Sequence, residues 1–550
     1  MNYQPTESNE KHQKPFFFFK TLVAYFSLNI SLIPFYLHKL NPDGISYISI
    51  ARKYCSGNVH DAINGVWSPL LSWLLIPFIW MDCNPLLGIK FISLLTGLLT
   101  LFGLYYLIKT FEISPEAEKY ACVGFVILNV YYSLYVITPD HLTVCFLVWY
   151  LLVIFNHQYT EKITGGLLCG FFGALSFLTK AFNFYFFLIH FLTLNVLIFF
   201  IHREKEKRKR IVANCILGFF FFALISSGWI YLLSEKYDAL TISTAGAYNF
   251  SLISPHSSGK PVEHIGLMPP TDSTGISIWD DPASLFSITW NPLKSREECV
   301  LYLRIILKNI AKFASVFSPT DNIFFVILYA LLLVGITMGA LFLLLKRSNH
   351  IICVFALITI FYYSAGYCLT MLVERYLRIV YILYFILGYA VLTAFFKGQF
   401  WSRKPAVQIF NPRTQSCLLI IYLILFTSIP TYKIFHKFNK HKALYTLSNS
   451  LKRDYHIEGN FASDSEWNTT LYLTYHLNGK YFGIPQGENV YEQLKKNNID
   501  YFFIWDEKNE ASFSPAGLPT IHIIEGKYEF TLVALHDNRR METARDSSRF

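Results

Sequence analysis

The chain has 550 residues, of which 53% are hydrophobic, 18% are aromatic and only 15% are charged. Soluble domains carry about a quarter charged residues, so this composition excludes an ordinary soluble protein and indicates a polytopic membrane protein. The net charge of +10 comes from short basic clusters between apolar runs, which is typical of cytoplasmic loops of membrane proteins and argues against a nucleic-acid-binding surface.

The apolar runs predict about eleven membrane crossings. Each run has about 17–24 residues, the length that a helix needs to cross the hydrocarbon core of a bilayer. The predicted crossings lie at 16–37, 86–108, 119–137, 141–157, 163–179, 182–202, 211–233, 322–345, 350–371, 376–396 and 416–434. A shorter run at 67–81 contains two prolines and predicts an interfacial or re-entrant helix.

The basic clusters predict the orientation of these crossings. With residues 1–15 in the cytoplasm, the most basic connections all fall on the cytoplasmic side, as the positive-inside rule expects. These connections are 202–210, Lys346–Arg347 and the loop that carries Lys397, Arg403, Lys404 and Arg413. The same threading places two long loops, 38–85 and 234–321, on the outer face together with most polar residues of interest.

The C-terminal region from 435 to 540 has a different pattern. Four strand-like segments, "NFASDSE", "KYFGIP", "YFFIW" and "TLVALH", alternate with the helix-like segments "NTTLYLTYHLNG" and "NVYEQLKKNNI". Strand–helix alternation predicts a small α/β domain with a largely parallel sheet, which we expect to be a soluble cap on the outer face. Residues 541–550 are expected to be a disordered tail, and 16–434 to form the membrane module.

Two acids lie at outer ends of predicted helices. Asp43 stands in the turn Pro42-Asp43-Gly44, before an amphipathic segment that predicts an interfacial helix. Its carboxylate can act as a general base or cap this helix. Asp140, in "VITPDHLTV", is either a second site acid or an acid favoured by the helix dipole. The neighbouring His141 is a base candidate or a structural histidine.

Several cations lie at the same predicted depth. Lys180 ends one span just before the next, and it either neutralises a phosphate or snorkels to the interface. Arg375 and Arg378 are about one helical turn apart and can grip a phosphate, whereas Glu374 and Arg375 can also tie helix ends together.

The long outer loop carries two further signals. Arg304, Lys308 and Lys312 recur every four residues and predict a basic amphipathic helix on the outer leaflet, which anchors lipid or guides an anionic head group. Tyr248 and Asn249 offer hydroxyl and amide contacts to a sugar.

The outer-loop residues resemble a known family. "DGISYISIARKY" followed by "WSPLLSWL" is similar to the first outer loop of the GT-C membrane glycosyltransferases, which include the protein O-mannosyltransferases and the lipid A aminoarabinose transferases. The matching positions are Asp43, Tyr47, Ala51–Arg52, Pro69–Leu70 and Trp73. "TPD", "GALSFLTKAF" and "ERYL" match further family patterns in the same order. The resemblance implies a GT-C fold with interfacial helices and a soluble C-terminal domain.

The resemblance also implies an activity. Family members move a sugar from a polyprenyl-phosphate carrier, with inversion, to a hydroxyl of a lipid, glycan or protein acceptor. By position, Asp43 would be the base, Asp140 the second acid, and Lys180 the partner of the lipid phosphate, with Arg375 as a further candidate. The substrate site would also include Tyr47, Arg52, Tyr248, Glu374 and Arg378.

One motif departs from the family pattern. The aminoarabinose transferases have Glu-Lys before Pro-Pro-Leu, where this chain reads Val66-Trp67-Ser68-Pro69-Leu70. The acidic metal contact and the lysine are therefore both missing, which argues against a bound zinc and against aminoarabinose as the sugar. No cofactor is fixed by the sequence, and a divalent cation stays open.

Two other function classes stay open. A transporter or flippase of lipid-linked saccharides needs acids or broken helices at mid-membrane, whereas the charges here gather at one rim. A ligase or polymerase of such saccharides shares the donor and the many spans. The outer face is either the periplasm or the endoplasmic reticulum lumen. The absence of retention signals and the otherwise short, compact loops favour a bacterial inner membrane, with the site and the C-terminal domain on the periplasmic side.

Overall fold

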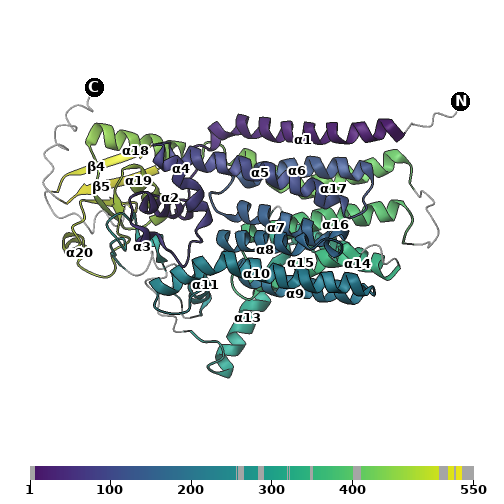
Figure 1. Ribbon diagram of the computed structural model, residues 1–550. Coiled ribbons are helices and arrows are strands. Elements are labelled where there is room, and N and C mark those ends of the chain that lie inside the picture. The colour runs from purple at the N-terminus through teal and green to yellow at the C-terminus, as the bar shows by residue number, and fades with distance from the viewer. Residues whose placement is uncertain are drawn as a thin grey trace.

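The computed structural model describes residues 7–535 except 256, 258–265, 283–289, 319, 321, 347–350, 401–409, 507–517 and 526–527. The expected disordered tail at 541–550 and the basic residues Arg347, Arg403 and Lys404 lie outside the described residues. Most helices run side by side in one bundle, and a small sheet lies at one end of it (Figure 1).

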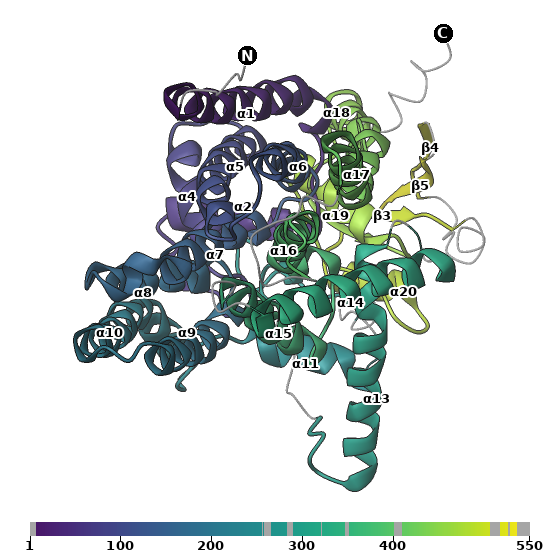
Figure 2. The same cartoon turned by 90° about the vertical axis from the view of Figure 1, so that its right-hand side faces the viewer.

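Helices occupy all eleven places where the sequence predicts a crossing. They are α1 (Glu7–Tyr36), α5 (Pro85–Lys109), α6 (Pro115–Leu134), α7 (Asp140–Phe155), α8 (Thr164–Thr179), α9 (Phe182–Ile201), α10 (Lys205–Lys236), α14 (Ile323–Lys346), α15 (Ile351–Cys368), α16 (Arg378–Phe396) and α17 (Pro412–His436). Viewed along the bundle, these helices form a packed group of roughly parallel rods (Figure 2).

Eight helices of the described chain are long and apolar enough to cross a membrane. They are α1, α5, α9, α10, α14, α15, α17, and α16 together with the short helix η6 (Glu374–Leu377) that precedes it. Helices α7 and α8 have 16 residues each, about 24 Å at 1.5 Å per residue, which is shorter than a bilayer core of about 30 Å. Helix α6 is longer but carries Glu116 and Glu118 in its first turn.

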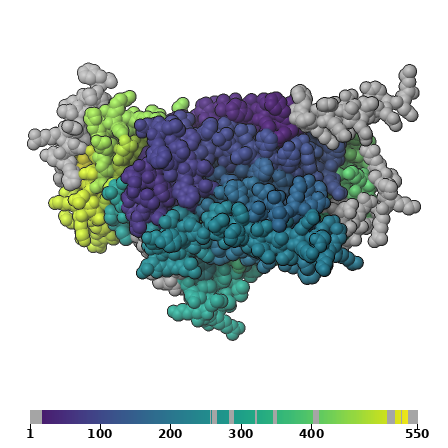
Figure 3. Space-filling model, in the orientation of Figure 1, coloured from purple at the N-terminus to yellow at the C-terminus, as the bar shows by residue number. Residues whose placement is uncertain are grey.

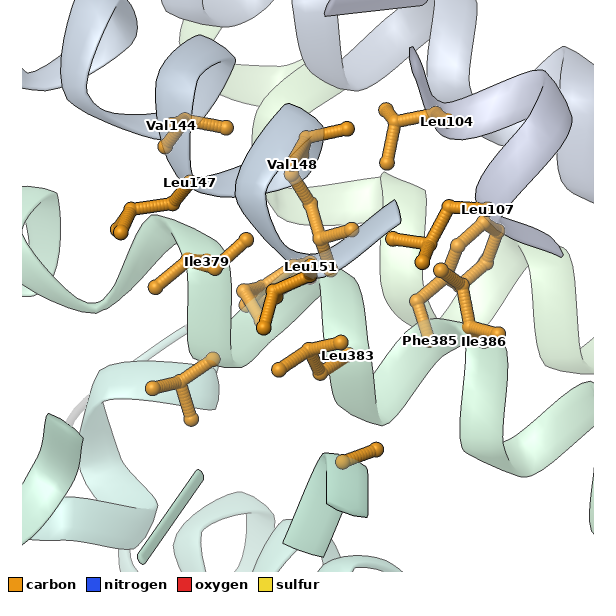
Figure 4. Close-up of a cluster of buried hydrophobic side chains, with 14 of the residues drawn as sticks. Leu104, Leu107, Val144, Leu147, Val148, Leu151, Ile379, Leu383, Phe385 and Ile386 are labelled. Carbon is orange, nitrogen blue, oxygen red and sulfur yellow. The ribbon is translucent and has the colours of Figure 1, made fainter. Parts of the chain in front are cut away.

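Helix α16 lies at the centre of the bundle. Within its apolar window, 78% of the residues are buried, and leucine, isoleucine and phenylalanine side chains from α5, α7 and α16 meet there (Figure 4). Burial on all sides explains why α16 is apolar around its whole circumference. Arg378 is the first residue of this central helix, and Arg375 lies in η6 directly before it.

Glycines bring α8 and α10 into close contact. A Cβ atom at Gly166 would lie 2.1 Å from the carbonyl oxygen of Asn214, and one at Gly170 would lie 2.3 Å from the carbonyl oxygen of Gly218. Small residues four apart on one helix let two backbones approach closely, as in membrane helix pairs.

Short elements cover one end of the bundle. They are α2 (Pro42–Cys55), α3 (Val59–Ala62), α4 (Leu70–Trp80), α11 (Ala245–Ile253) and η2 (Ile278–Asp280). Helix α4 corresponds to the predicted interfacial or re-entrant segment; its 11 residues span about 16 Å, too short for a crossing. Another short helix, η1 (His157–Thr160), follows α7 at the opposite end of the bundle.

Helix α13 (Arg296–Phe313) leaves the bundle. It has no buried residue and projects from the body, followed by η4 (Ala314–Phe317) (Figures 1 and 3). The Tyr302 hydroxyl donates to the Leu369 carbonyl, and the Asn309 amide donates to the carbonyls of Cys368 and Thr370. These bonds hold one side of the predicted basic amphipathic helix against the end of α15.

The C-terminal region forms a mixed sheet, which corrects one expectation. The strands β1 (Asn460–Ser463), β2 (Lys480–Tyr481), β3 (Tyr501–Ile504), β4 (Thr520–Glu525) and β5 (Tyr528–Ala534) have the order β2-β1-β3-β5-β4. Strand β1 pairs in parallel with β2 and β3, but β5 is antiparallel to both β3 and β4. The prediction of a largely parallel sheet was therefore wrong for half of the pairings. Only two residues separate β4 from β5, so the chain returns directly and the pair must be antiparallel.

The sheet and its helices α18 (Lys442–Tyr455), α19 (Trp467–His476) and α20 (Val490–Lys496) pack on the short elements. The Tyr472 hydroxyl donates to the His38 carbonyl, and the Tyr481 N–H donates to the Ile276 carbonyl. We call this end of the bundle the cap end; α1, α6, α8 and α17 finish there, and α2, α7 and η6 begin there.

Candidate functional site

Two buried acids begin neighbouring helices at the cap end. Asp43 lies in the first turn of α2, after Pro42, and Asp140 is the first residue of α7, after Pro139. The proline fixes a backbone angle that suits a helix start, so both carboxylates stand at well-defined positions. Among the described residues, neither carboxylate accepts a hydrogen bond from a backbone N–H, so capping does not account for their placement.

Arg375 joins the two acids. Its Nη2 lies 2.7 Å from Asp43 Oδ2, and its Nε lies 3.6 Å from Asp140 Oδ2. Lys180 reaches the other oxygen of Asp140, with Nζ 2.6 Å from Oδ1. We call Asp43, Asp140, Lys180 and Arg375 the acid–base cluster; its members come from four different elements.

The two acids have different surroundings. Both oxygens of Asp140 are engaged, because the Thr138 hydroxyl donates to Oδ2 at 2.7 Å and Lys180 holds Oδ1. Within the described chain, Asp43 has Arg375 as its one hydrogen-bonding or ion-pair partner, through Oδ2. The Oδ1 atom of Asp43 therefore has no partner among the described residues, whereas Asp140 contacts two cations, Lys180 and Arg375.

Tyrosines surround the acid–base cluster. Lys180 Nζ lies 3.2 Å from the ring centroid of Tyr376, and Tyr47 is buried one turn after Asp43 with its ring against Trp67. Burial and the nearby charge of Asp43 raise the pKa values of Tyr47 and Tyr248. Both hydroxyls therefore stay protonated at neutral pH, and the structure brings both expected substrate residues close to Asp43.

Arg52 does not join these residues. Its guanidinium lies 5.2 Å from the ring centroid of Tyr475, on helix α19 of the C-terminal region. Nine residues separate Arg52 from Asp43, which is two and a half helical turns and places the two on opposite faces of α2. Arg52 thus fastens α2 to the C-terminal region.

Glu374 and Arg378 line a neighbouring cavity of about 170 Å³. The Tyr131 hydroxyl donates to Glu374 Oε1 at 3.2 Å, and Lys433 forms an ion pair with Oε2. Arg378 lies over the Tyr132 ring, 4.6 Å from its centroid. We call this cavity the tyrosine pocket; it is lined by Tyr131, Tyr132, Tyr135, Val136, Val316, Val373, Glu374, Arg375, Leu377, Arg378, Tyr381, Ile429 and Pro430.

His141 has a structural contact. Its Nε2 lies 3.1 Å from Asn129 Oδ1, and the side chain is buried between α6 and α7. This contact fits the structural alternative for His141 rather than a role as a base at Asp43.

Sequence reasoning missed several buried charges at the cap end. Lys53 pairs with Asp272, and the carboxylate of Asp280 accepts a hydrogen bond from Ser49 at 2.6 Å. These contacts fasten the long outer loop to α2. Lys53 belongs to the quoted "ARKY" segment, but its partner lies more than 200 residues away, and no local signal identifies that pairing.

The described residues do not fit a metal ion. No group of three or more His, Cys, Asp and Glu side chains within the described ranges is arranged to hold one. At the acid–base cluster, the guanidinium of Arg375 occupies the position between the two carboxylates where a cation would be held. A guanidinium carries its own positive charge and has no acceptor to offer a metal.

The comparisons with known proteins identify the fold. No protein-family model matches the sequence, and no curated protein matches it. The structure is similar to ArnT from Cupriavidus metallidurans in the apo state, with a TM-score of 0.58 and 10% sequence identity over 96% of this chain and 98% of that chain. The undecaprenyl phosphate-bound form of the same protein gives a TM-score of 0.51 over the same shares, again at 10% identity.

A second solved protein has a similar fold. The oligosaccharyltransferase AglB from Archaeoglobus fulgidus, in complex with an inhibitory peptide and a dolichol-phosphate, gives a TM-score of 0.54 at 12% identity. The match covers 89% of this chain and 69% of that chain. Both neighbours have the GT-C fold. The chain is therefore an integral membrane protein with the GT-C fold and a C-terminal α/β region, as the sequence predicts.

Proposed function

We propose that the protein is an inverting glycosyltransferase that moves a sugar from a polyprenyl-phosphate carrier to a hydroxyl of a lipid, glycan or protein acceptor. The observation that carries this proposal is the buried Asp43 carboxylate, with Oδ2 held by Arg375 and Oδ1 without a hydrogen-bond partner among the described residues. The GT-C fold supports it, and the titles of two fold neighbours name undecaprenyl phosphate and dolichol-phosphate as their ligands.

Asp43 is the general base. An acceptor hydroxyl next to Oδ1 gives its proton to Asp43 as its oxygen attacks the anomeric carbon of the donor sugar. The bond between that carbon and the phosphate oxygen breaks, and the electron pair leaves on the polyprenyl phosphate. Because the nucleophile enters opposite the leaving group, the anomeric configuration inverts.

Lys180 and Arg375 stabilise the leaving phosphate. Each has N–H groups beyond those that meet Asp140 and Asp43, since an ammonium has three donors and a guanidinium five. Preorganised donors of this kind stabilise charge that develops in the transition state. Asp140 positions both cations, and the protonated hydroxyls of Tyr47 and Tyr248 contact the sugar.

The active site lies on the outer face of the membrane. The acid–base cluster and the C-terminal region share the cap end, and the basic segment 202–210 lies at the other end of α10. The positive-inside rule then places the cap end outside, which in a bacterial inner membrane is the periplasm.

Mass spectrometry of surface glycolipids and glycoproteins tests this function. A deletion strain should lose a modification of one pentose or hexose mass, and wild-type protein should restore it. Asp43→Asn should insert and fold but restore nothing, while Arg453→Gln, at an exposed position of α18, should restore the modification fully. Restoration by Asp43→Asn would exclude the general-base role.

An assay in detergent separates transfer from transport. The purified protein, incubated with lipid extract that contains donor and acceptor, should still form the modified product, because transfer needs no sealed compartment. A flippase would form none. Product formation that survives in Asp43→Asn would contradict the proposal.

A further inference from the structure

Three cations from three elements lie against the tyrosines that end α6. Lys39 Nζ, from the α1–α2 connection, lies 3.8 Å from the ring centroid of Tyr135. Arg378, on α16, lies 4.6 Å from that of Tyr132, and Lys433, on α17, lies 6.0 Å from that of Tyr131. All three rings line the tyrosine pocket.

Two of these cations form no ion pair with a described residue, although Asp140 acts on Arg378 at longer range. Lys433 pairs with Glu374, but no described residue forms a hydrogen bond or ion pair with the side chain of Arg378 or with Lys39 Nζ. Both residues are buried, with 4% of Arg378 and 9% of Lys39 exposed. An aromatic ring compensates a buried cation by only about 1–2 kcal/mol, whereas an unpaired buried charge costs several times more.

The electrostatic surroundings of Lys39 are one-sided. Burial, reinforced by the cations Lys90, Lys440, Lys437 and Arg378, lowers the pKa of Lys39 to about 6. Lys39 is therefore mostly neutral at pH 7.5 while the pocket is empty. An anion in the neighbouring tyrosine pocket would raise the pKa of Lys39, and Lys39 would then take up a proton.

We propose that the tyrosine pocket is a second anion-binding site, which holds one phosphate-like oxyanion in addition to the carrier phosphate assigned to Lys180 and Arg375. A cavity of about 170 Å³ is small compared with the 300–1,000 Å³ of sites for whole ligands, so it holds one small group. The two guanidinium side chains that line it, Arg375 and Arg378, favour an oxyanion as that group. Arg378 and Arg375, which both line the cavity, bind this group, and Lys39, against the Tyr135 ring, contributes a positive charge from behind the pocket wall.

The proposal gives the acceptor a chemical class. Arg375 lines the tyrosine pocket and also holds Asp43, so an anionic group in the pocket lies beside the proposed base. If the proposed function is correct, this arrangement selects an acceptor that carries a phosphate. A phospholipid head group offers the same chemistry from the surrounding membrane, and the test below distinguishes the two.

Inorganic sulfate is a suitable probe, because it is a tetrahedral dianion with no proton to exchange at pH 7.5. We expect the purified full-length protein to bind sulfate in calorimetry, with proton uptake measured from two buffers of different ionisation heat. Arg378→Gln should weaken binding at least tenfold, and Arg378→Lys should weaken it less. Lys39→Met should abolish the proton uptake.

Matched controls are available at exposed positions. Arg453→Gln and Lys495→Met make the same chemical changes in the C-terminal region, and both should bind sulfate as the wild type does. Sulfate binding that is undetectable, or equally strong in Arg378→Gln, would overturn the proposal. Size-exclusion profiles verify that each variant is folded, and Arg378→Lys remains informative if Arg378→Gln does not fold.

Competition identifies the source of the anion. In nanodiscs, phosphatidylglycerol that displaces sulfate would assign the site to phospholipid head groups, whereas displacement only by the phosphate-bearing acceptor extract would assign it to the acceptor. Displacement by polyprenyl phosphate that requires Arg378 but not Lys180 would overturn the separation of the two sites. Asp43→Asn should bind sulfate normally, so failure of transfer and failure of the anion site are distinguishable.

Discussion

The pairing of Lys180 with Asp140 makes a quantitative prediction. The two charges lie 2.6 Å apart, with 18% and 5% of their side chains exposed. Removing one partner of a buried pair typically costs about 3–5 kcal/mol, because the other charge remains buried. Arg375 Nε, 3.6 Å from Asp140, and Tyr376, under Lys180, compensate part of the loss. We therefore expect Lys180→Met and Asp140→Asn each to lower the free energy of unfolding by about 2–4 kcal/mol.

The double variant should be more stable than either single one. Lys180→Met with Asp140→Asn removes both charges and keeps similar volumes, which is often close to neutral. With an unfolding entropy of about 2 cal/mol/K per residue, 1 kcal/mol corresponds to about 1 °C for this chain. Each single variant should then lose about 2–4 °C in Tm, and the double variant about 1 °C.

Thermal unfolding of the four proteins in one detergent measures this cycle. Additive effects, with the double variant losing the sum of the two single shifts, would refute the reasoning that the two side chains form one charge pair. The transfer assay adds a second readout: if Asp140 positions cations, the double variant should recover stability but not turnover.

Three further predictions concern other parts of the molecule. Gly166→Ala should lower Tm by several degrees, because its Cβ would meet the Asn214 carbonyl; Gly228→Ala, where nothing lies within 4 Å, is the matched control and should not lower it. Arg375→Lys should reduce turnover at least tenfold in the transfer assay without loss of folded protein, since an ammonium does not reach both carboxylates at once; unchanged turnover would remove the bridge from the mechanism. The pKa of Lys39 is lowered to about 6, so the folded protein holds this lysine neutral at pH values where the unfolded chain would protonate it. Burying Lys39 therefore costs stability, and this cost shrinks as the pH rises from about 6 to about 10. Lys39→Met should therefore be more stable than the wild type at pH 7, with a flatter pH dependence of Tm; an unchanged pH profile would contradict the burial of a neutral lysine.

Sequence reasoning located the helices because bilayer thickness fixes their length. It also brought Asp43, Asp140, Lys180 and Arg375 to one end of the bundle through the distribution of basic loops alone. It did not pair them, because hydropathy gives the depth of a residue but not its direction around the helix axis. For Arg52, the nine-residue spacing to Asp43 already indicated the opposite face of the helix, but the prediction followed the family resemblance instead.

Other features left no usable signal. Lys39 stands at the end of a predicted span, where snorkelling lysines are common, and only the packed structure distinguishes a buried lysine from an exposed one. The sequence analysis identified β1, β2, β3 and β5 but missed β4, whose segment "TIHII" is interrupted by His522 and has no buried residue in the structure. The mixed sheet follows from this missed strand and from the return of β5 alongside β3.

The bridge between Asp43 and Arg375 also bears on biogenesis. A ribosome that adds about 5–20 residues per second must extend the chain by more than 300 residues after Asp43 before Arg375 is made. For roughly half a minute, the amino-terminal half resides in the membrane with this carboxylate lacking its counter-ion. Until Arg375 arrives, this carboxylate has to stay in contact with water, because burying it without a counter-ion is costly.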